Sequence, residues 1–523
     1  MIDMSRNSVM NIPSLKAFIK KLKGYGYDTV MLYTEDTYEV EGLPYFGYLR
    51  GRYTKEELQE LDGYCASIGV ELIPCIQTLA HLNAYVRWGK CKTDIDDILL
   101  VDDEATYELI EQFIKSTRDS FKSKRIHIGM DEAWKLGRGK HLDKYGLEAP
   151  SAIMKRHLEK VLSICKKYDF KPLIWSDMFF RSWNNNAYYI GKTTIPEDIK
   201  SSIPAGVSSV FWDYYHTDEE AYDAMFENHK QMSRDIWFAG GAWSWSGIVP
   251  HNGYTLKTML PALRSVRKYK IKNVFFTLWG DNGGECSHFS QLPSLFYLAE
   301  YAKGNTDEEA IKEKFKRREG VSFDDFMKID LPNIVCENTE RENPSKYMLY
   351  SDPFVGFLDY TVKEGTAELY KGYAAELYKV AKSSRKYAYL FNTEAKLCEV
   401  LYHKYELGVK TRSAYKAGDK DALLRLVKED YNPLLPLIRS LRKVYLKQWY
   451  KDNKAFGFEV QDIRLGGLLQ RIESCRDRLL CYISGEIDRI EELEAEILPA
   501  SQKPMGEPIS FNSYTRTVTP AVF

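Results

Sequence analysis

Residues 125–132 read Arg-Ile-His-Ile-Gly-Met-Asp-Glu, a short apolar strand that ends on two adjacent carboxylates. The same arrangement recurs along roughly the first 300 residues, and after each short apolar run we expect a stretch with helical spacing of apolar residues. The expected strands cover 2–4, 29–33, 70–76, 125–130, 173–176, 208–212, 236–239 and 273–278. Eight strand-then-helix units in about 300 residues are typical of an α/β fold, the (β/α)8 TIM barrel.

The competing fold is a doubly wound open sheet, which usually has fewer strands and a glycine-rich phosphate loop after the first strand. That loop is absent here. After about residue 304 the strand pattern fades and helical patterns dominate, for example over 423–427 and 434–449. We therefore expect a catalytic barrel over 1–304 and a mostly α-helical C-terminal domain over 305–523, with an irregular tail from residue 499.

Composition excludes several classes of protein. The chain of 523 residues has 73 Lys and Arg against 74 Asp and Glu, which argues against a surface built for nucleic acid or a polybasic membrane anchor. No apolar run approaches the roughly 18 residues of a membrane span. The nine cysteines are scattered, without a CxxC pair or an HExxH motif, so we expect no disulfide framework, no metal and no cofactor. A cytoplasmic location is the simplest expectation, and a missing upstream domain is an alternative because the chain enters a strand almost at once.

Aromatic residues make up 14% of the chain, and four of its ten tryptophans stand at consecutive strand ends. In a barrel the active site lies at the carboxyl ends of the strands. The apolar face of a pyranose stacks on indole, and its hydroxyls need charged hydrogen-bond partners. The pattern therefore indicates a sugar pocket whose walls are Trp175, Trp212, Trp243 and Trp279.

Asp131 and Glu132 suit glycosidic chemistry, in which one carboxyl stays protonated near neutral pH and acts as the acid. Successive side chains of a strand leave on opposite faces. An adjacent pair is therefore poorly placed to act as separate acid and protein nucleophile, which sit about 5–5.5 Å apart in retaining enzymes. One carboxyl acting on the leaving oxygen and the other holding part of the substrate fits the spacing better.

The run from His127 to Glu132 closely resembles the strand-four motif of the β-N-acetylhexosaminidases of glycoside hydrolase family 20. That motif usually reads His-Ile-Gly-Gly-Asp-Glu, and here Met130 replaces the second glycine. The stretches 130–145 and 453–464 and the helical C-terminal region resemble the firmicute exo-β-N-acetylglucosaminidase branch of that family.

The resemblance implies substrate-assisted retention, in which the 2-acetamido oxygen of the sugar attacks the anomeric carbon and forms an oxazolinium intermediate. Glu132 would be the general acid and then the base, and Asp131 would accept from the acetamide N–H. A tyrosine would hold the acetamide oxygen: Tyr214, with Tyr215 in reserve, although the family usually takes it from the seventh strand. His81 would hydrogen-bond Glu132 and complete the catalytic set.

The remaining site residues follow from the same resemblance. Glu35 or Asp36 would support His81. The hydroxyls far from the cleaved bond would be bound by Arg6, Asp281 and Glu285. These residues would also close that end of the pocket, which restricts the enzyme to exo action. The partner is a terminal β-linked GlcNAc or GalNAc of an oligosaccharide or glycoconjugate, not a nucleic acid or a membrane, and a second copy of the chain is a candidate partner.

Two other functions stay open at this point. A retaining glycosidase could use separated carboxylates such as Glu132 and Glu285, and a catalytically silent barrel could bind sugar without cleaving it. The intact Asp131–Glu132 pair argues against the second alternative.

Overall fold

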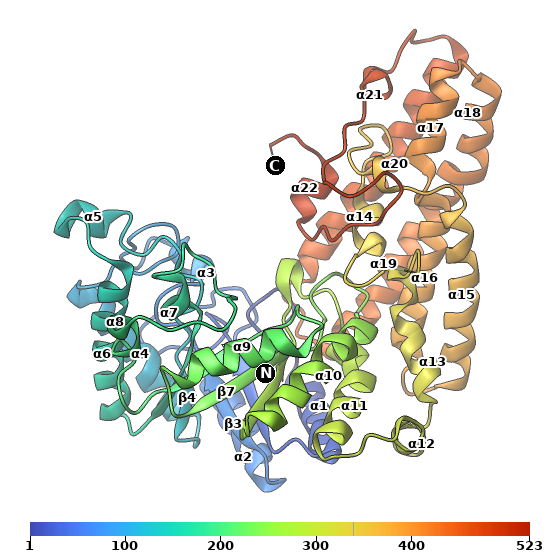
Figure 1. Ribbon diagram of the computed structural model, residues 1–523. Helices are drawn as coiled ribbons and strands as arrows, with labels where there is room; N and C mark the ends of the chain where they lie inside the picture. Colours follow the sequence, from blue (N-terminus) through green and yellow to red (C-terminus); the bar gives the residue numbers. More distant parts are fainter. Residues whose placement is uncertain (338, 523) are drawn as a thin grey trace.

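Eight parallel strands form a barrel in the computed structural model, which describes residues 1–337 and 339–522 (Figure 1). Each strand pairs with the next in chain order, and a parallel bridge between Ile2 and Leu278 joins the last strand to the first. The predicted (β/α)8 barrel is therefore confirmed. The strands are β1 (Ile2–Asp3), β2 (Thr29–Tyr33), β3 (Glu71–Cys75), β4 (Arg125–His127), β5 (Lys171–Trp175), β6 (Ser208–Trp212), β7 (Ile236–Gly241) and β8 (Asn273–Thr277).

Amphipathic helices surround the barrel because their apolar faces pack on the strands. Local signals fix where they begin: α2 begins at Lys55, after the capping residue Thr54, whose hydroxyl accepts from Glu57 N while the Glu57 carboxylate accepts from Thr54 N. Between β5 and β6 the chain forms the two short helices α7 and α8 and no long helix. The helices of this part are α1 (Ile12–Tyr25), α2 (Lys55–Ser67), α3 (Asn83–Val86), α4 (Glu104–Ser120), α5 (Lys140–Tyr145), α6 (Pro150–Lys167), α7 (Asp177–Arg181), α8 (Glu197–Lys200), α9 (Glu219–Lys230), α10 (Asn252–Lys268) and α11 (Leu292–Ala302).

From α12 onward the chain is helical, and this helical region stands beside the barrel on the side of α1, α10 and α11 (Figure 1). Its longest helices run roughly alongside one another, and α19 packs against α1 of the barrel. The helices are α12 (Glu308–Glu319), α13 (Phe323–Met327), α14 (Pro344–Tyr350), α15 (Thr366–Ser383), α16 (Ala388–Lys404), α17 (Leu407–Lys416), α18 (Lys420–Leu426), α19 (Asn432–Asp452), α20 (Phe458–Ser484), α21 (Glu491–Glu494) and α22 (Tyr514–Val518).

The predicted domain boundary, between residues 304 and 305, falls in the loop from α11 to α12 and stays a prediction. The tail after residue 498 is mostly irregular but contains the short helix α22. In the described part of the chain, no helix is both long and apolar enough to cross a bilayer.

Candidate active site

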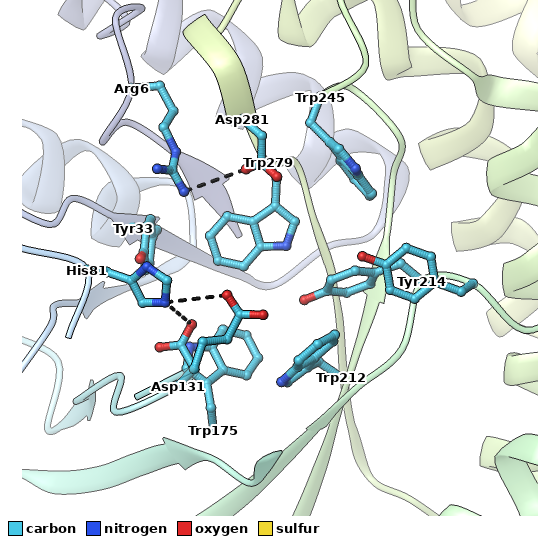
Figure 2. A pocket seen from close by; sticks show the side chains of 12 residues that line it. Arg6, Tyr33, His81, Asp131, Trp175, Trp212, Tyr214, Trp245, Trp279 and Asp281 are labelled. Carbon is cyan, nitrogen blue, oxygen red and sulfur yellow. Dashed lines mark ion pairs between the residues drawn. The ribbon is translucent and has the colours of Figure 1, made fainter. Parts of the chain in front are cut away.

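A pocket opens at the carboxyl ends of the barrel strands (Figure 2). All eight strands contribute to it, through a residue at the end of the strand or in the loop that follows. It is lined by Arg6, Tyr33, His81, Asp131, Glu132, Trp175, Trp212, Tyr214, Tyr215, Trp245, Trp279 and Asp281. The structure thus brings together every residue predicted for the site from sequence except Trp243 and Glu285.

The turn after β4 presents the two carboxylates, and it does so through an unusual backbone. Gly129, Met130 and Glu132 have φ values of 72°, 70° and 53°. Residues with a side chain seldom adopt this left-handed region, so the surrounding contacts must hold them there. Met130, which replaces the usual glycine of the motif, is fully buried.

Gln77, which follows β3, fixes this turn. Its Oε1 accepts from Met130 N at 3.2 Å, and its Nε2 donates to Asp131 Oδ1 at 2.8 Å and to the Tyr33 hydroxyl at 2.9 Å. A Cβ on Gly129 would lie 2.1 Å from Gln77 Oε1 and 2.9 Å from the carbonyl oxygen of Ile76. Only glycine at this position therefore leaves Gln77 free to orient Asp131.

Gly129→Ala is accordingly expected to destabilise the protein by more than about 1–2 kcal/mol, the cost of a left-handed residue with a side chain, and to lower activity through Asp131. Urea unfolding and a rate assay measure both effects. Gly63→Ala in α2, where a Cβ would meet nothing within 4 Å, is the matched control and should not destabilise. Equal stability of the two variants would contradict the steric argument.

One ring nitrogen of His81 faces both carboxylates, and Figure 2 shows the imidazole beside Asp131. Its Nε2 is 3.3 Å from Asp131 Oδ2 and 3.7 Å from Glu132 Oε2. The sequence pointed to a bond with Glu132, whereas the nearer partner is Asp131. Burial alone would lower the pKa of His81, but the negative charges of Asp131, Glu35 and Glu132 outweigh it and raise this pKa to about 10. The imidazole is therefore a cation at neutral pH.

The pKa values of the two carboxyl groups are shifted in opposite directions. Burial, and then the charge of Asp131, raise the pKa of Glu132 to about 7. Burial alone would also raise the pKa of Asp131, but the His81 cation and the hydrogen bond from Gln77 overcome it and lower that pKa. At neutral pH Asp131 is thus ionised while a large fraction of Glu132 still carries its proton, which divides the pair into an anion and an acid.

Charged groups close the other end of the pocket. Arg6 lies 3.5 Å from Glu35 Oε1, 3.6 Å from Asp281 Oδ1 and 3.1 Å from Asp3 Oδ2. Of the two acids predicted to support His81, Glu35 lies beside Arg6, and its negative charge helps to raise the pKa of His81. Asp36 instead pairs with Arg50 at 3.0 Å, away from His81.

Aromatic rings form the walls, but Trp243, one of the predicted wall residues, is not among the residues that line the pocket. The rings of Trp279 and Tyr33 meet edge to face with their centroids 4.8 Å apart, and the rings of Trp212 and Tyr214 stack with their centroids 5.4 Å apart. Trp243 lies behind the wall, where its Nε1 donates to the carbonyl oxygen of Tyr214 at 2.9 Å. Trp245 lines the pocket in its place, stacked on Trp243 at 4.4 Å.

Glu285 is the second residue that the structure places elsewhere. Its carboxylate forms buried ion pairs with Lys346 at 2.9 Å and Arg464 at 2.6 Å, both from the helical region. A tight turn that begins at Asp281 carries the chain away from the pocket, so the two acids lie in different surroundings although only three residues separate them.

Tyr214 and Tyr215 both reach the pocket, but their surroundings differ. The Tyr214 side chain is buried beside Thr277 and Trp279, and this burial raises its pKa well above the usual range. Its hydroxyl therefore stays protonated and can donate a hydrogen bond. Tyr215 is 37% exposed and faces the mouth.

Three residues of the site escaped the sequence reasoning: Tyr33, Gln77 and Asp177. Asp177 Oδ2 accepts from Glu132 N at 3.0 Å and so anchors the backbone of the acid. Burial, followed by the charge of Asp131, raises the pKa of Asp177 to about 6. All three stand at a strand end or two residues after one, a position that could have found them.

Two family models match the chain. Residues 32–214 match the catalytic domain of glycosyl hydrolase family 20, and residues 324–511 match the glycoside hydrolase 20C C-terminal domain. No curated protein matches the chain.

Solved structures with a similar fold are distant. One is a GH20 exo-β-N-acetylglucosaminidase from Vibrio harveyi in complex with N-acetylglucosamine, with 15% identity and a TM-score of 0.45 over 63% of this chain and 58% of that one. Another is a β-N-acetylhexosaminidase from Bacteroides fragilis, with 18% identity and a TM-score of 0.45 over 61% and 68%. This chain thus spans less than two thirds of the Vibrio protein. On the two family models, which lie on the barrel and on the helical region, the chain belongs to glycoside hydrolase family 20.

Proposed function

We propose that the protein is an exo-acting, retaining β-N-acetylhexosaminidase that removes terminal non-reducing β-linked GlcNAc or GalNAc by substrate-assisted catalysis. The firmicute exo-β-N-acetylglucosaminidase branch is the part of the family in which we place it. The observation that carries the proposal is the pair Asp131 and Glu132, whose pKa values are moved in opposite directions on one wall of an aromatic pocket.

In the first step the acetamide oxygen of the sugar attacks the anomeric carbon while the glycosidic C–O bond breaks. Glu132 gives its proton to the leaving oxygen. Asp131, held as an anion by His81 and Gln77, accepts from the acetamide N–H and stabilises the positive charge of the oxazolinium ring. Tyr214 donates its hydroxyl proton to a hydrogen bond with the acetamide oxygen, which keeps that oxygen aimed at the anomeric carbon.

In the second step a water molecule attacks the anomeric carbon and passes a proton to the Glu132 carboxylate. The bond between the acetamide oxygen and the anomeric carbon breaks, the acetamide is restored, and Glu132 is again protonated. Two displacements at one carbon give net retention. Arg6 and Asp281 bind hydroxyls at the closed end, Trp175, Trp212, Trp245 and Trp279 surround the sugar, and the mouth is left for the leaving group.

The alternative with a protein nucleophile is weakened by the position of Glu285. Its carboxylate is buried between two cations and is not part of the pocket lining. The other acid that lines the pocket, Asp281, lies against Arg6. The homodimer and the cytoplasmic location stay predictions from the sequence.

A thiazoline that mimics the cyclised acetamide is the decisive probe. We expect it to inhibit hydrolysis of p-nitrophenyl β-GlcNAc at least about a hundredfold more tightly than the substrate binds, because it resembles the intermediate. The matched substrate p-nitrophenyl β-glucoside, which lacks the acetamide, should not be cleaved measurably. Hydrolysis that is insensitive to the thiazoline, or equal cleavage of the two substrates, would reject the substrate-assisted mechanism.

A further inference from the structure

The loop after β8 carries Trp279 and Asp281 into the pocket and then crosses to the helical region. Asn282, Gly283 and Gly284 have φ values of 57°, 135° and 61°, so three successive residues are in the left-handed half of backbone space. Glycine adopts this region freely and asparagine tolerates it, so the loop takes this shape at little cost, and its contacts decide where it lies. Contacts within the barrel hold its start, where Gly280 N donates to Asp3 Oδ2 and Arg6 lies 3.6 Å from Asp281 Oδ1, and contacts from the helical region hold the residues that follow.

Arg464 of α20 holds this loop at two points. Its Nη1 donates to the carbonyl oxygen of Asn282 at 2.9 Å and to Glu285 Oε1 at 2.6 Å. A Cβ on Gly283 would lie 3.0 Å from the same Nη1, so loop and guanidinium are in close contact. The residue next to Asp281 is therefore bonded directly to the helical region.

Glu285 receives further support from two other helices. Lys346 of α14 lies 2.9 Å from Glu285 Oε2, and the hydroxyl of Tyr445 in α19 donates to the Glu285 carbonyl oxygen at 2.9 Å. The side chains of Glu285 and Lys346 are each 2% exposed. Because a buried charge without its partner is costly, Glu285 cannot leave its two cations without a large penalty.

The loop after β7, which carries Trp245, is held from the same side. Asn343, at the start of α14, donates to the carbonyl oxygen of Ser246 at 2.7 Å. A Cβ on Gly247 would lie 3.1 Å from Lys346 Cβ. One turn of α14 thus supports both loops that complete the pocket wall.

We propose that the helical region shapes the sugar pocket, with Arg464 as a positioning residue that holds the loop after β8 so that Asp281 faces the hydroxyls of the bound sugar. The inference rests on the proposed function for the identity of the sugar. It gives the C-terminal helices a part in substrate recognition, although none of their residues lines the pocket.

The test compares Arg464→Met with Arg471→Met in the full chain. Arg471 lies two turns further along α20 and pairs with Asp352 inside the helical region, so its loss also removes a charged pair but touches no barrel loop. The first readout is hydrogen exchange of the segment 279–286. The second is kcat and KM for p-nitrophenyl β-GlcNAc.

Arg464→Met should speed exchange in 279–286 and raise KM about ten- to a hundredfold, the value of one charged hydrogen bond to the sugar, without moving the pH profile set by Glu132. Arg464→Lys should restore part of the affinity, and Arg471→Met should match wild type in both readouts. If Arg464→Met does not fold, Arg464→Gln is the second variant: it lacks the guanidinium but leaves Glu285 paired with Lys346, and it should show the same two effects.

Unchanged exchange, or faster exchange with unchanged KM, would overturn the proposal. The same holds if Arg471→Met has the same effects, since both results would then reflect general destabilisation. If the wild-type enzyme does not cleave p-nitrophenyl β-GlcNAc, the proposed function is rejected independently of this inference. The positioning role of Arg464 is then decided by hydrogen exchange of 279–286 and by the KM for whichever substrate the wild-type enzyme does cleave.

Discussion

Replacing Glu132 with glutamine is expected to lower kcat for p-nitrophenyl β-GlcNAc by about 10²- to 10⁴-fold, the usual contribution of a general acid. Glutamine keeps the size of the side chain but has no proton to give to the leaving oxygen. Burial and the Asp131 charge raise the pKa of Glu132 to about 7, so the wild-type carboxyl is a competent acid near neutrality. Steady-state kinetics of purified wild-type and variant protein measure the loss.

The pH dependence of kcat/KM tests the same role of Glu132. An acid must be protonated, so wild-type kcat/KM should fall as the pH rises through about 7, and Glu132→Gln should lose this limb. A 2,4-dinitrophenyl leaving group needs no proton and is the internal control: the first step with this substrate should be nearly as fast in the variant. Full activity on p-nitrophenyl β-GlcNAc, or an unchanged alkaline limb, would show that another group is the acid.

The barrel was predictable because each strand is a short apolar run followed by an amphipathic helix, a pattern that local sequence carries by itself. Strand ends then locate the site, which is why Asp131, His81 and Trp279 could be named. The unit between β5 and β6 departs from this pattern, since its two helices, α7 and α8, have only five and four residues.

Loops limited the prediction of the pocket. Trp243 and Trp245 are two residues apart after β7, and only the fold of the loop decides which one faces the sugar. Glu285 was assigned to the pocket because it lies four residues after Asp281. Its actual partners, Lys346 and Arg464, come from helices that no local pattern connects to the barrel.

Three charged residues of the site have an unfavourable backbone conformation. Glu35, His81 and Glu132 all have positive φ values, of 45°, 60° and 53°. Side-chain-bearing residues adopt this region at a cost that the surrounding contacts must offset. Apart from Gly129, nothing in the sequence marks these turns, so their geometry could only come from the structure.

Asp131→Asn is expected to reduce kcat by about 10²- to 10³-fold while the sugar still binds, because the charge of Asp131 acts mainly on the positive charge that develops in the transition state. Asparagine is nearly isosteric and can keep a bond with Gln77, so the pocket should stay formed. The measurement is kcat together with the dissociation constant of GlcNAc, obtained from tryptophan fluorescence. Equal loss of turnover and binding would make Asp131 a ground-state contact instead.

The same substitution should change how the neighbouring groups titrate. The charge of Asp131 is the largest cause that raises the pKa of His81 and, after burial, the next cause that raises the pKa of Glu132. Without it both pKa values fall, so the residual alkaline limb should move to lower pH. Asp36→Asn is the matched control: this acid is also buried but pairs with Arg50, and its loss should leave the pH profile in place. A limb that stays near pH 7 in Asp131→Asn would show that Glu132 owes its high pKa to burial alone.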